Sequence, residues 1–251
     1  MMKDLINRHL GEGEFVMYLQ SKHDAKTEKI SGAEALSRYK RADGTIISPD
    51  KYIDLLEDEK LIHELDFTML DHTCAFLKVL EEKGIHLPIS VNFSRATIER
   101  DNFLETFYNV VKPYNIPPEF IEIEITEFHS FNNISYMCDV VKNLRSNGYR
   151  ISIDDYGKNY SVFSVIRQVD VDVLKIDREL ITESVEKEKT RIIFESVVKL
   201  SQKLNISVVA EGVETERQLE ITREIGCDNI QGWYFSKAVP SEEFLQTLIR
   251  A

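Results

Sequence analysis

Short apolar runs alternate with amphipathic stretches along most of the chain. The apolar runs are rich in β-branched residues, which favours strands, and the stretches between them carry apolar residues at helical spacing. From residue 89 onward the order strand, then helix, repeats with short connections. The pattern predicts strands at 15–19, 89–92, 121–124, 149–154, 171–176, 206–211 and 229–234, and a further short strand leading to Glu34.

Helices are expected in the remaining stretches, several of which end at glycine or begin at a capping residue. Their ranges are 3–10, 66–82, 102–111, 135–145, 161–167, 188–204 and 214–225, with a helical stretch beginning at Asp50 and a last helix capped by Ser241. Such alternation predicts an α/β protein with a parallel sheet, and about eight strands suggest a TIM-type (β/α)8 barrel. The first two strands lack a full helix between them, so the start is expected to depart from regular order. We expect residues 1–251 to form one domain.

Composition narrows the functional classes. The net charge of -12 argues against a nucleic-acid duplex or an anionic membrane as the main partner. Cys74, Cys138 and Cys227 are widely separated, which argues against a zinc–thiolate site and fits a reducing compartment. No apolar run approaches the roughly 20 residues needed to cross a bilayer. A cytoplasmic location is the expectation.

Two adjacent carboxylates, Asp154 and Asp155, close an apolar run that begins at Tyr149. Ionised carboxylates side by side repel each other, and a divalent cation would remove the conflict. Other polar groups also stand at the carboxyl ends of predicted strands, where α/β barrels carry their chemistry. The full set is Glu34, Asn92, Glu124, Asp154, Asp155, Lys175, Glu211 and Gln231.

This set favours a hard cation, because it is rich in oxygen and contains neither cysteine nor histidine. Mg²⁺ or Mn²⁺ is the expectation, and five carboxylates carry enough charge for two ions. Two such ions can activate water for an in-line displacement at phosphorus, with Lys175 positioning or polarising that water. Any single acid could instead be a helix cap or a surface ion pair, and Asn92 could cap the next helix. Lys175, inside an apolar strand, is harder to explain structurally.

The segment from Gly32 to Arg38 contains the Glu34-Ala35-Leu36 signature that names the EAL domain, and the chain resembles this family of cyclic di-GMP phosphodiesterases. The resemblance runs from about Phe15 to the C-terminus. Its blocks are Tyr18-Leu19-Gln20, Val91-Asn92-Phe93-Ser94, Glu124-Ile125-Thr126-Glu127, Asp154-Asp155-Tyr156-Gly157, Leu174-Lys175-Ile176-Asp177, Ala210-Glu211-Gly212-Val213-Glu214-Thr215 and Gln231-Gly232-Trp233-Tyr234-Phe235-Ser236.

The resemblance implies a barrel with one early antiparallel strand and hydrolysis of cyclic di-GMP to linear 5'-pGpG. It implies that one metal ion is held by Glu34, Asn92, Glu124 and Asp154, and a second by Asp154, Asp155 and, through water, Glu211. By the same resemblance Lys175 contacts the nucleophilic water, Glu211 is a candidate general base, and Gln20 and Arg38 contact substrate. It assigns supporting roles to Glu127, Glu214 and Gln231, and it implies a homodimer.

The main departure from the family pattern lies in the loop after Asp155. Asn159 stands where the family has a glycine, and Val162 where it has a serine. Asparagine tolerates the left-handed region better than most residues, but a position open only to glycine would be strained. Lys158, Asn159 and Val162 therefore make the catalytic rate an open question. A smaller departure is Ser21, where a proline is usual.

An active phosphodiesterase is the favoured reading, because none of the expected metal-binding residues is missing. The alternative is a catalytically weak or inactive domain that acts as a cyclic di-GMP receptor or a protein-interaction module. A metal-dependent lyase, which the barrel alone would allow, does not explain Gln20, Arg38 and the ordered family blocks.

Overall fold

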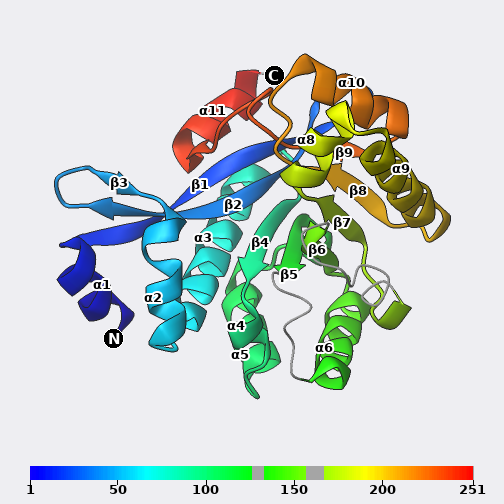
Figure 1. The fold of residues 1–251 in the computed structure, drawn as a ribbon. Helices are drawn as coiled ribbons and strands as arrows, with labels where there is room; N and C mark the ends of the chain where they lie inside the picture. The colour runs from blue at the N-terminus through cyan, green and yellow to red at the C-terminus, as the bar shows by residue number, and fades with distance from the viewer. Residues whose placement is uncertain (126–132, 157–166, 251) are drawn as a thin grey trace.

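Eight strands close into a barrel in the part of the chain that the structure describes (Figure 1). The computed structural model describes residues 1–125, 133–156 and 167–250, with the side chains of residues 155 and 156 left out. Around the barrel the strands follow the order β1 (Gly13–Asp24), β9 (Asn229–Ile230), β8 (Ser207–Ala210), β7 (Val173–Ile176), β6 (Arg150–Tyr156), β5 (Ile121–Ile125), β4 (Ile89–Phe93) and β2 (Ile30–Arg41), which pairs again with β1.

Strand β1 runs antiparallel to both of its barrel neighbours, β2 and β9, whereas the pairs from β2 through β4 to β9 are parallel. The expected barrel with one early antiparallel strand is thus confirmed. Two short strands, β3 (Ile46–Ile47) and β10 (Val239–Pro240), extend the sheet beyond the ring.

Strand β2 is much longer than the sequence pattern predicts. It continues seven residues past Glu34 and pairs with β1 up to Arg41 and Gly13. Figure 1 shows this β1–β2 hairpin projecting from the barrel towards β3. The prediction that Glu34 ends a strand is therefore wrong. Strand β2 continues because β1 remains its pairing partner beyond the barrel.

Helices cover the outside of the barrel, apart from α1, which lies beside the projecting part of the β1–β2 hairpin (Figure 1). Within the described ranges they are α1 (Met2–Leu10), α2 (Ile53–Asp58), α3 (Ile62–Glu82), α4 (Arg95–Ile98), α5 (Phe103–Val111), α6 (Ile134–Ser146), α8 (Arg178–Glu186), α9 (Glu188–Lys203), α10 (Glu216–Ile225) and α11 (Ser241–Arg250). Short 3-10 turns cover Pro49–Lys51, Lys112–Tyr114 and Pro118–Phe120. The helix expected at 161–167 falls almost entirely outside the described residues.

The sequence pattern misses α8, and the structure explains why. Its start is capped by the Asp177 side chain, which accepts a hydrogen bond from the Glu179 backbone N–H at 2.7 Å. Only Ile181 and Ser184 are buried in this helix, so its apolar periodicity is weak. The same cap places Asp177 directly after strand β7, two residues beyond Lys175.

Alternation along the parallel strands divides the buried residues into two sets. Ile123 and Ile125 of β5, like Leu174 and Ile176 of β7, join the apolar core that packs under the helices. Side chains one residue away point to the opposite face, which is the barrel interior. That interior is polar, and it includes Glu122, Glu124, Ser90, Ser152 and Lys175, which are all buried.

The interior has a lower polar layer towards the amino ends of the parallel strands. Lys22 of β1 donates to Glu122 Oε1 and to Ser90 Oγ, both at 2.9 Å. Arg150 Nη2 lies 3.9 Å from the other oxygen of Glu122. Two residues further along β4, β5 and β6, the next inward-facing side chains are Asn92, Glu124 and Ser152. The layer next to the candidate site is therefore an ion pair, Lys22–Glu122, and not a set of apolar side chains.

Candidate active site

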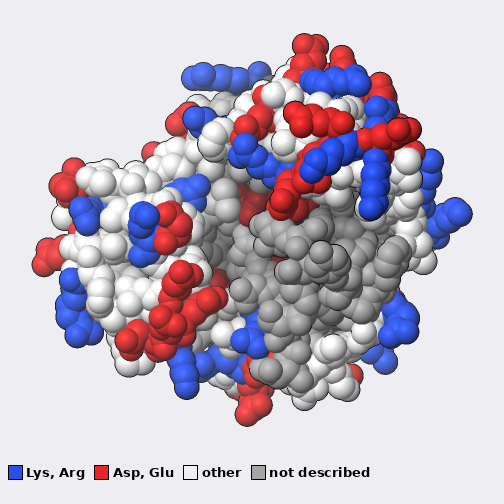
Figure 2. All heavy atoms as spheres, viewed as in Figure 1, with Lys and Arg blue, Asp and Glu red and all other residues white. Residues whose placement is uncertain are grey.

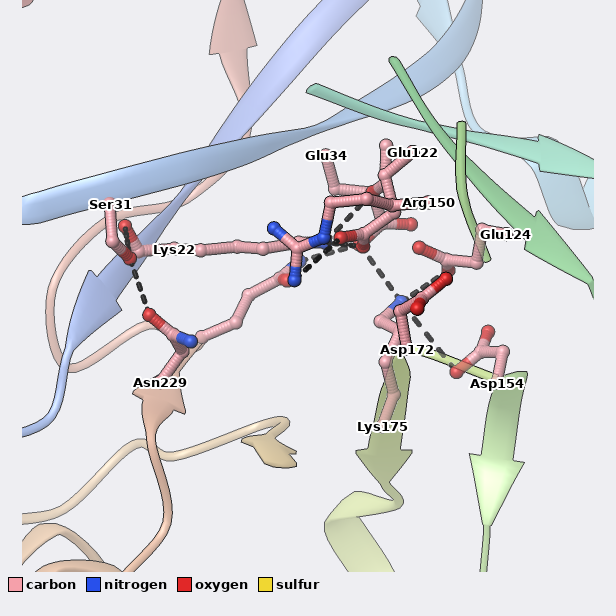
Figure 3. A network of polar contacts seen from close by, with 12 residues as sticks. Lys22, Ser31, Glu34, Glu122, Glu124, Arg150, Asp154, Asp172, Lys175 and Asn229 are labelled. Carbon is pink, nitrogen blue, oxygen red and sulfur yellow. Dashed lines mark hydrogen bonds and ion pairs between the residues drawn. The ribbon is translucent and has the colours of Figure 1, made fainter. Parts of the chain in front are cut away.

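Lys175 lies at the centre of the upper polar layer (Figure 3). Its side chain is 1% exposed, and its ammonium contacts four carboxylates from four other segments. Nζ lies 2.7 Å from Glu211 Oε1, 3.4 Å from Glu34 Oε2 and 3.6 Å from Asp154 Oδ1, and it also hydrogen-bonds to Glu124 Oε1. The structure therefore brings together five of the side chains that the sequence singles out.

Two amides hold the carboxylate of Glu34 from either side. Asn92 Nδ2 donates to Oε1 at 2.9 Å, and Gln231 Nε2 donates to Oε2 at 2.6 Å. Asn92 lies within β4, and the Ser94 side chain accepts from Thr97 N to cap α4. The alternative in which Asn92 caps the following helix is thus wrong.

The hydrogen bonds continue from Gln231 to the wall formed by β1. Gln231 Nε2 also donates to Gln20 Oε1 at 3.2 Å, and Gln20 Nε2 donates to the carbonyl of Ser236 at 3.0 Å. The last contact fixes the orientation of the Gln20 amide, because only its nitrogen can donate to a carbonyl. Gln20 and Glu34 are also directly opposite in the β1–β2 ladder.

Burial and mutual repulsion shape the protonation of these acids. Burial raises the pKa of Glu124 to about 8, and the nearby Glu34 and Asp154 charges act in the same direction while Lys175 opposes them. Burial likewise raises the pKa of Glu211 well above its ordinary value, against the attraction of Lys175. Burial disfavours the charge on Lys175, but the carboxylates of Asp154 and Glu124 outweigh it and hold its pKa well above the usual value. The ammonium thus stays charged.

The donor set fits a hard divalent cation. It offers carboxylate and amide oxygens, which are the ligands that Mg²⁺ and Mn²⁺ prefer. Two buried acceptors, Glu124 Oε2 and Gln231 Oε1, make no hydrogen bond within the described part of the chain. Among the described residues, no three histidine, cysteine or acidic side chains form a group arranged to hold an ion. The four carboxylates converge on Lys175 instead.

Glu211 and Glu214 lie in the connection between β8 and α10. Glu211 follows β8, and Gly212 beside it has φ of 63°, a conformation that favours glycine. Glu214 accepts from both terminal nitrogens of Arg178, at 2.9 and 3.1 Å. Glu214 is thus tied to the start of α8 and makes none of the contacts to Lys175 described above.

Arg38 lies on the projecting part of the β1–β2 hairpin, four residues beyond Glu34. Its guanidinium donates to the Ser37 carbonyl at 2.7 Å and stands 5.7 Å from the centre of the Tyr18 ring. It is half-buried and is not among the groups that contact Lys175. Because side chains alternate along a strand, Arg38 is on the same face of β2 as Glu34.

Several expected site residues lie outside the part of the chain that the structure describes. Glu127 and the altered loop positions Lys158, Asn159 and Val162 lie outside the described residues, and of Asp155 only the backbone, in β6, is described. Their expected roles are neither supported nor contradicted by the geometry.

Sequence reasoning missed the lower layer. Lys22 and Glu122 are buried, and Figure 3 shows them beside the group around Lys175. The signal was present in the sequence, because Glu122 stands two residues before Glu124 and Lys22 two residues after Gln20. Period-two spacing puts each pair on one face of a strand.

Charged side chains of both signs are interspersed over the face shown in Figure 2, most densely where Figure 1 places α8, α9 and α10. Ion pairs such as Arg191–Glu224 and Arg217–Glu220 belong to these helices. The described residues present no broad basic surface on this face, in keeping with the net charge. No helix among them is both long enough and apolar enough to span a membrane.

The chain is similar to known proteins over nearly its whole length. A family model described as "EAL domain" matches residues 4–238. Signaling protein YkoW of Bacillus subtilis is 31% identical over 235 residues, which cover 94% of this chain and 29% of that protein. Cyclic di-GMP phosphodiesterase NbdA of Pseudomonas aeruginosa is 30% identical, over 98% of this chain and 32% of the relative. The chain thus spans about a third of these two relatives.

Among solved structures, the PaMucR phosphodiesterase in complex with c-di-GMP matches with a TM-score of 0.87 at 27% identity. The match covers 97% of each chain. The overall fold of this chain therefore recurs in a protein whose structure is a complex with c-di-GMP.

Proposed function

The chain belongs to the EAL domain family, and we propose that it is a metal-dependent phosphodiesterase that hydrolyses cyclic di-GMP to linear 5'-pGpG. The observation that carries this proposal is the convergence of Glu34, Glu124, Asp154 and Glu211 on Lys175 inside the barrel. The relative NbdA is named a cyclic di-GMP phosphodiesterase, which supports the choice of substrate.

Oxygens of Glu34, Asn92, Glu124 and Asp154 would hold one divalent cation, Mg²⁺ or Mn²⁺, and Asp154, Asp155 and, through water, Glu211 would hold a second. When bound, such ions supply Lewis-acid stabilisation of charge at phosphorus and lower the pKa of a water molecule. The two buried acceptors without hydrogen bonds, on Glu124 and Gln231, support a cation at this place.

The protein groups would orient and move protons. Lys175 donates a hydrogen bond to the attacking water and holds it in line with the phosphorus. Glu211, whose carboxylate lies 2.7 Å from Lys175 Nζ, accepts the water's proton. Attack forms a bond from the water oxygen to phosphorus and breaks the bond from phosphorus to one 3' oxygen, which takes up a proton and leaves as a hydroxyl, so the ring opens to a linear product with one terminal 5'-phosphate. Gln20 and Arg38 contact the dinucleotide, with Arg38 suited to a phosphate oxygen because its guanidinium is a planar, permanent cation.

Three further roles belong to the same proposal. Gln231 steadies Glu34, Glu214 steadies the segment that carries Glu211, and Glu127 anchors the loop after Asp155. We also propose a homodimer, as the family resemblance implies, which sedimentation of the purified protein would test. A non-catalytic receptor is not favoured, because the described residues retain Glu34, Asn92, Glu124, Asp154, Lys175 and Glu211.

A metal-dependent turnover assay tests the proposal. We expect purified protein with Mg²⁺ or Mn²⁺ to release 5'-pGpG from cyclic di-GMP, and excess chelator to stop the release. Tight binding of cyclic di-GMP without turnover, across both metals and a range of protein concentrations, would overturn it in favour of a receptor.

A further inference from the structure

Lys175 occupies the place where the acids of the site converge. Its ammonium contacts Glu211, Glu34, Asp154 and Glu124, and the side chain is almost fully buried. These carboxylates are the groups to which the proposed function assigns divalent cations, so the inference below rests on that function. The role proposed so far for Lys175, positioning a water, does not explain why one ammonium contacts all four acids.

The acids need a counter-ion whether or not a substrate is present. Glu124 is completely buried and Glu34 is 6% exposed. Removing one partner of a buried ion pair is strongly destabilising, because the remaining charge is left without compensation. Lys175 is the cation that the described contacts give to these carboxylates, so it holds them together in the folded protein.

A divalent cation would use the same oxygen atoms. Glu124 Oε1 already accepts from Lys175, and Glu34 Oε2 and Asp154 Oδ1 lie 3.4 and 3.6 Å from its ammonium. Two cations on shared oxygens repel each other strongly in a buried site. We propose that Lys175 is a tethered counter-ion that competes with the divalent cation for these carboxylates and gives up part of its contacts when the cation binds.

The hydrogen-bond pattern shows that Lys175 does not satisfy the site fully. Glu124 Oε2 and Gln231 Oε1 are buried acceptors with no partner among the described residues. The three donors of the ammonium and the amide donors of Asn92 and Gln231 still leave Glu124 Oε2 without a hydrogen bond among the described residues. Acceptor capacity is thus left over for a second cation, and competition rather than exclusion is the expected relation.

Lys22 provides a matched control one layer below. It is also a buried lysine, and its ammonium is paired with Glu122 and Ser90 rather than with the four acids around Lys175. The double substitution Lys22→Met with Glu122→Gln removes this pair while keeping the local charge balanced. It perturbs the barrel interior without freeing any oxygen of the proposed cation site.

Calorimetric titration with Mn²⁺ tests the proposal. The protein, Lys175→Met and the Lys22→Met/Glu122→Gln control are purified in Mn²⁺, and affinities are measured by competition with a chelator, so a variant that unfolds without metal still yields a value. We expect Lys175→Met to bind Mn²⁺ more tightly, by about 5- to 150-fold, the usual range of coupling between two sites. Its unfolding temperature in chelator should fall below that of the unsubstituted protein.

The control should lower the unfolding temperature while leaving the Mn²⁺ affinity unchanged. An affinity of Lys175→Met equal to or weaker than that of the unsubstituted protein would overturn the proposal. Lys175→Gln, which keeps an N–H donor, should show the same direction of change. Absence of Mn²⁺ binding by the unsubstituted protein would instead overturn the proposed function itself, so the two failures are distinguishable.

Discussion

Glu34 illustrates how a single side chain depends on distant parts of the chain. Its carboxylate receives hydrogen bonds from Asn92 on β4 and from Gln231 after β9, and it lies near the ammonium of Lys175 on β7. These contacts come from β4, which is the neighbour of β2, from the segment after β9, and from β7. A carboxylate held at both oxygens has little rotational freedom, which favours a fixed ligand geometry.

Gln231 should matter for catalysis although it carries no charge. Gln231→Leu removes the hydrogen bond to Glu34 Oε2 and the link to Gln20, so the carboxylate loses one of its two amide supports. We expect a loss of about 10- to 100-fold in Mn²⁺ affinity or in the rate of cyclic di-GMP hydrolysis, as for other residues that orient a metal ligand. Titration and initial rates check this. Gln202→Leu, at a surface glutamine bound to the Gly226 carbonyl, should leave both unchanged; equal effects at the two positions would contradict the assignment.

Asp66 should make stability depend on pH. Burial raises its pKa from 3.8 to about 6, with Glu57 adding repulsion, although Ser94 and Thr97 donate to its Oδ2. Because the folded-state pKa is the higher one, the folded protein holds this proton more tightly than the unfolded chain. This contribution therefore falls as the pH rises from 3.8 to about 6, by roughly 3 kcal/mol in all.

The substitution Asp66→Asn removes this titration while keeping a carbonyl oxygen for the same donors. Urea unfolding at about pH 4.5 and about pH 7 should show the variant gaining stability, relative to the unsubstituted protein, at the higher pH. An identical pH dependence in both proteins would show that Asp66 ionises normally inside the fold.

At the scale of elements, the connection from β8 to α10 links the site to a helix. Glu211 follows β8, and the Thr215 side chain caps α10 by accepting from the Gln218 backbone N–H, while Gln218 Oε1 accepts from the Thr215 backbone N–H. Gly212 between them lies close to the start of α8, since a Cβ there would stand 2.6 Å from Arg178 Cβ. Glu211 directly precedes this close approach, and its Oε1 lies 2.7 Å from Lys175 Nζ.

Gly212→Ala should damage both stability and activity. The new methyl group meets a positive φ of 63° and the side chain of Arg178, so we expect a loss of about 1–3 kcal/mol and a displaced Glu211 with slower hydrolysis. Gly44→Ala is the control, because Gly44 also has a positive φ but a Cβ added there would have no other atom within 4 Å. It should lose only stability. Parallel losses of activity in both variants would contradict the role of the Arg178 contact.

For the whole molecule, the sequence pattern predicted the barrel and most of the residues that converge inside it. Period-two runs such as Ile121–Ile125 mark strands, and strand–helix alternation leaves few topologies open. The barrel then brings Glu124 and Lys175 together although they are far apart in sequence. Those parts were predictable because they follow from local pattern and closure.

Other features depend on contacts that no local pattern reveals. The length of β2 depends on its pairing with β1 beyond the barrel, and α8 forms with little buried surface of its own. For the lower layer, the sequence shows only that Lys22 and Glu122 each lie two residues from a predicted site residue, and this spacing does not predict that they form an ion pair. The position of the Lys175 ammonium among four acids likewise emerges from the packed interior.

The most direct test of the account compares two acid-to-alanine variants in the release of 5'-pGpG at saturating Mn²⁺. Glu34→Ala removes the carboxylate held by Asn92 and Gln231, whereas Glu220→Ala removes an exposed acid paired with Arg217 on α10. We expect Glu34→Ala to slow hydrolysis by more than about 100-fold, since loss of a metal ligand should exceed the effect of losing its supports, and Glu220→Ala to leave the rate unchanged. A rate for Glu34→Ala close to that of Glu220→Ala would contradict the account.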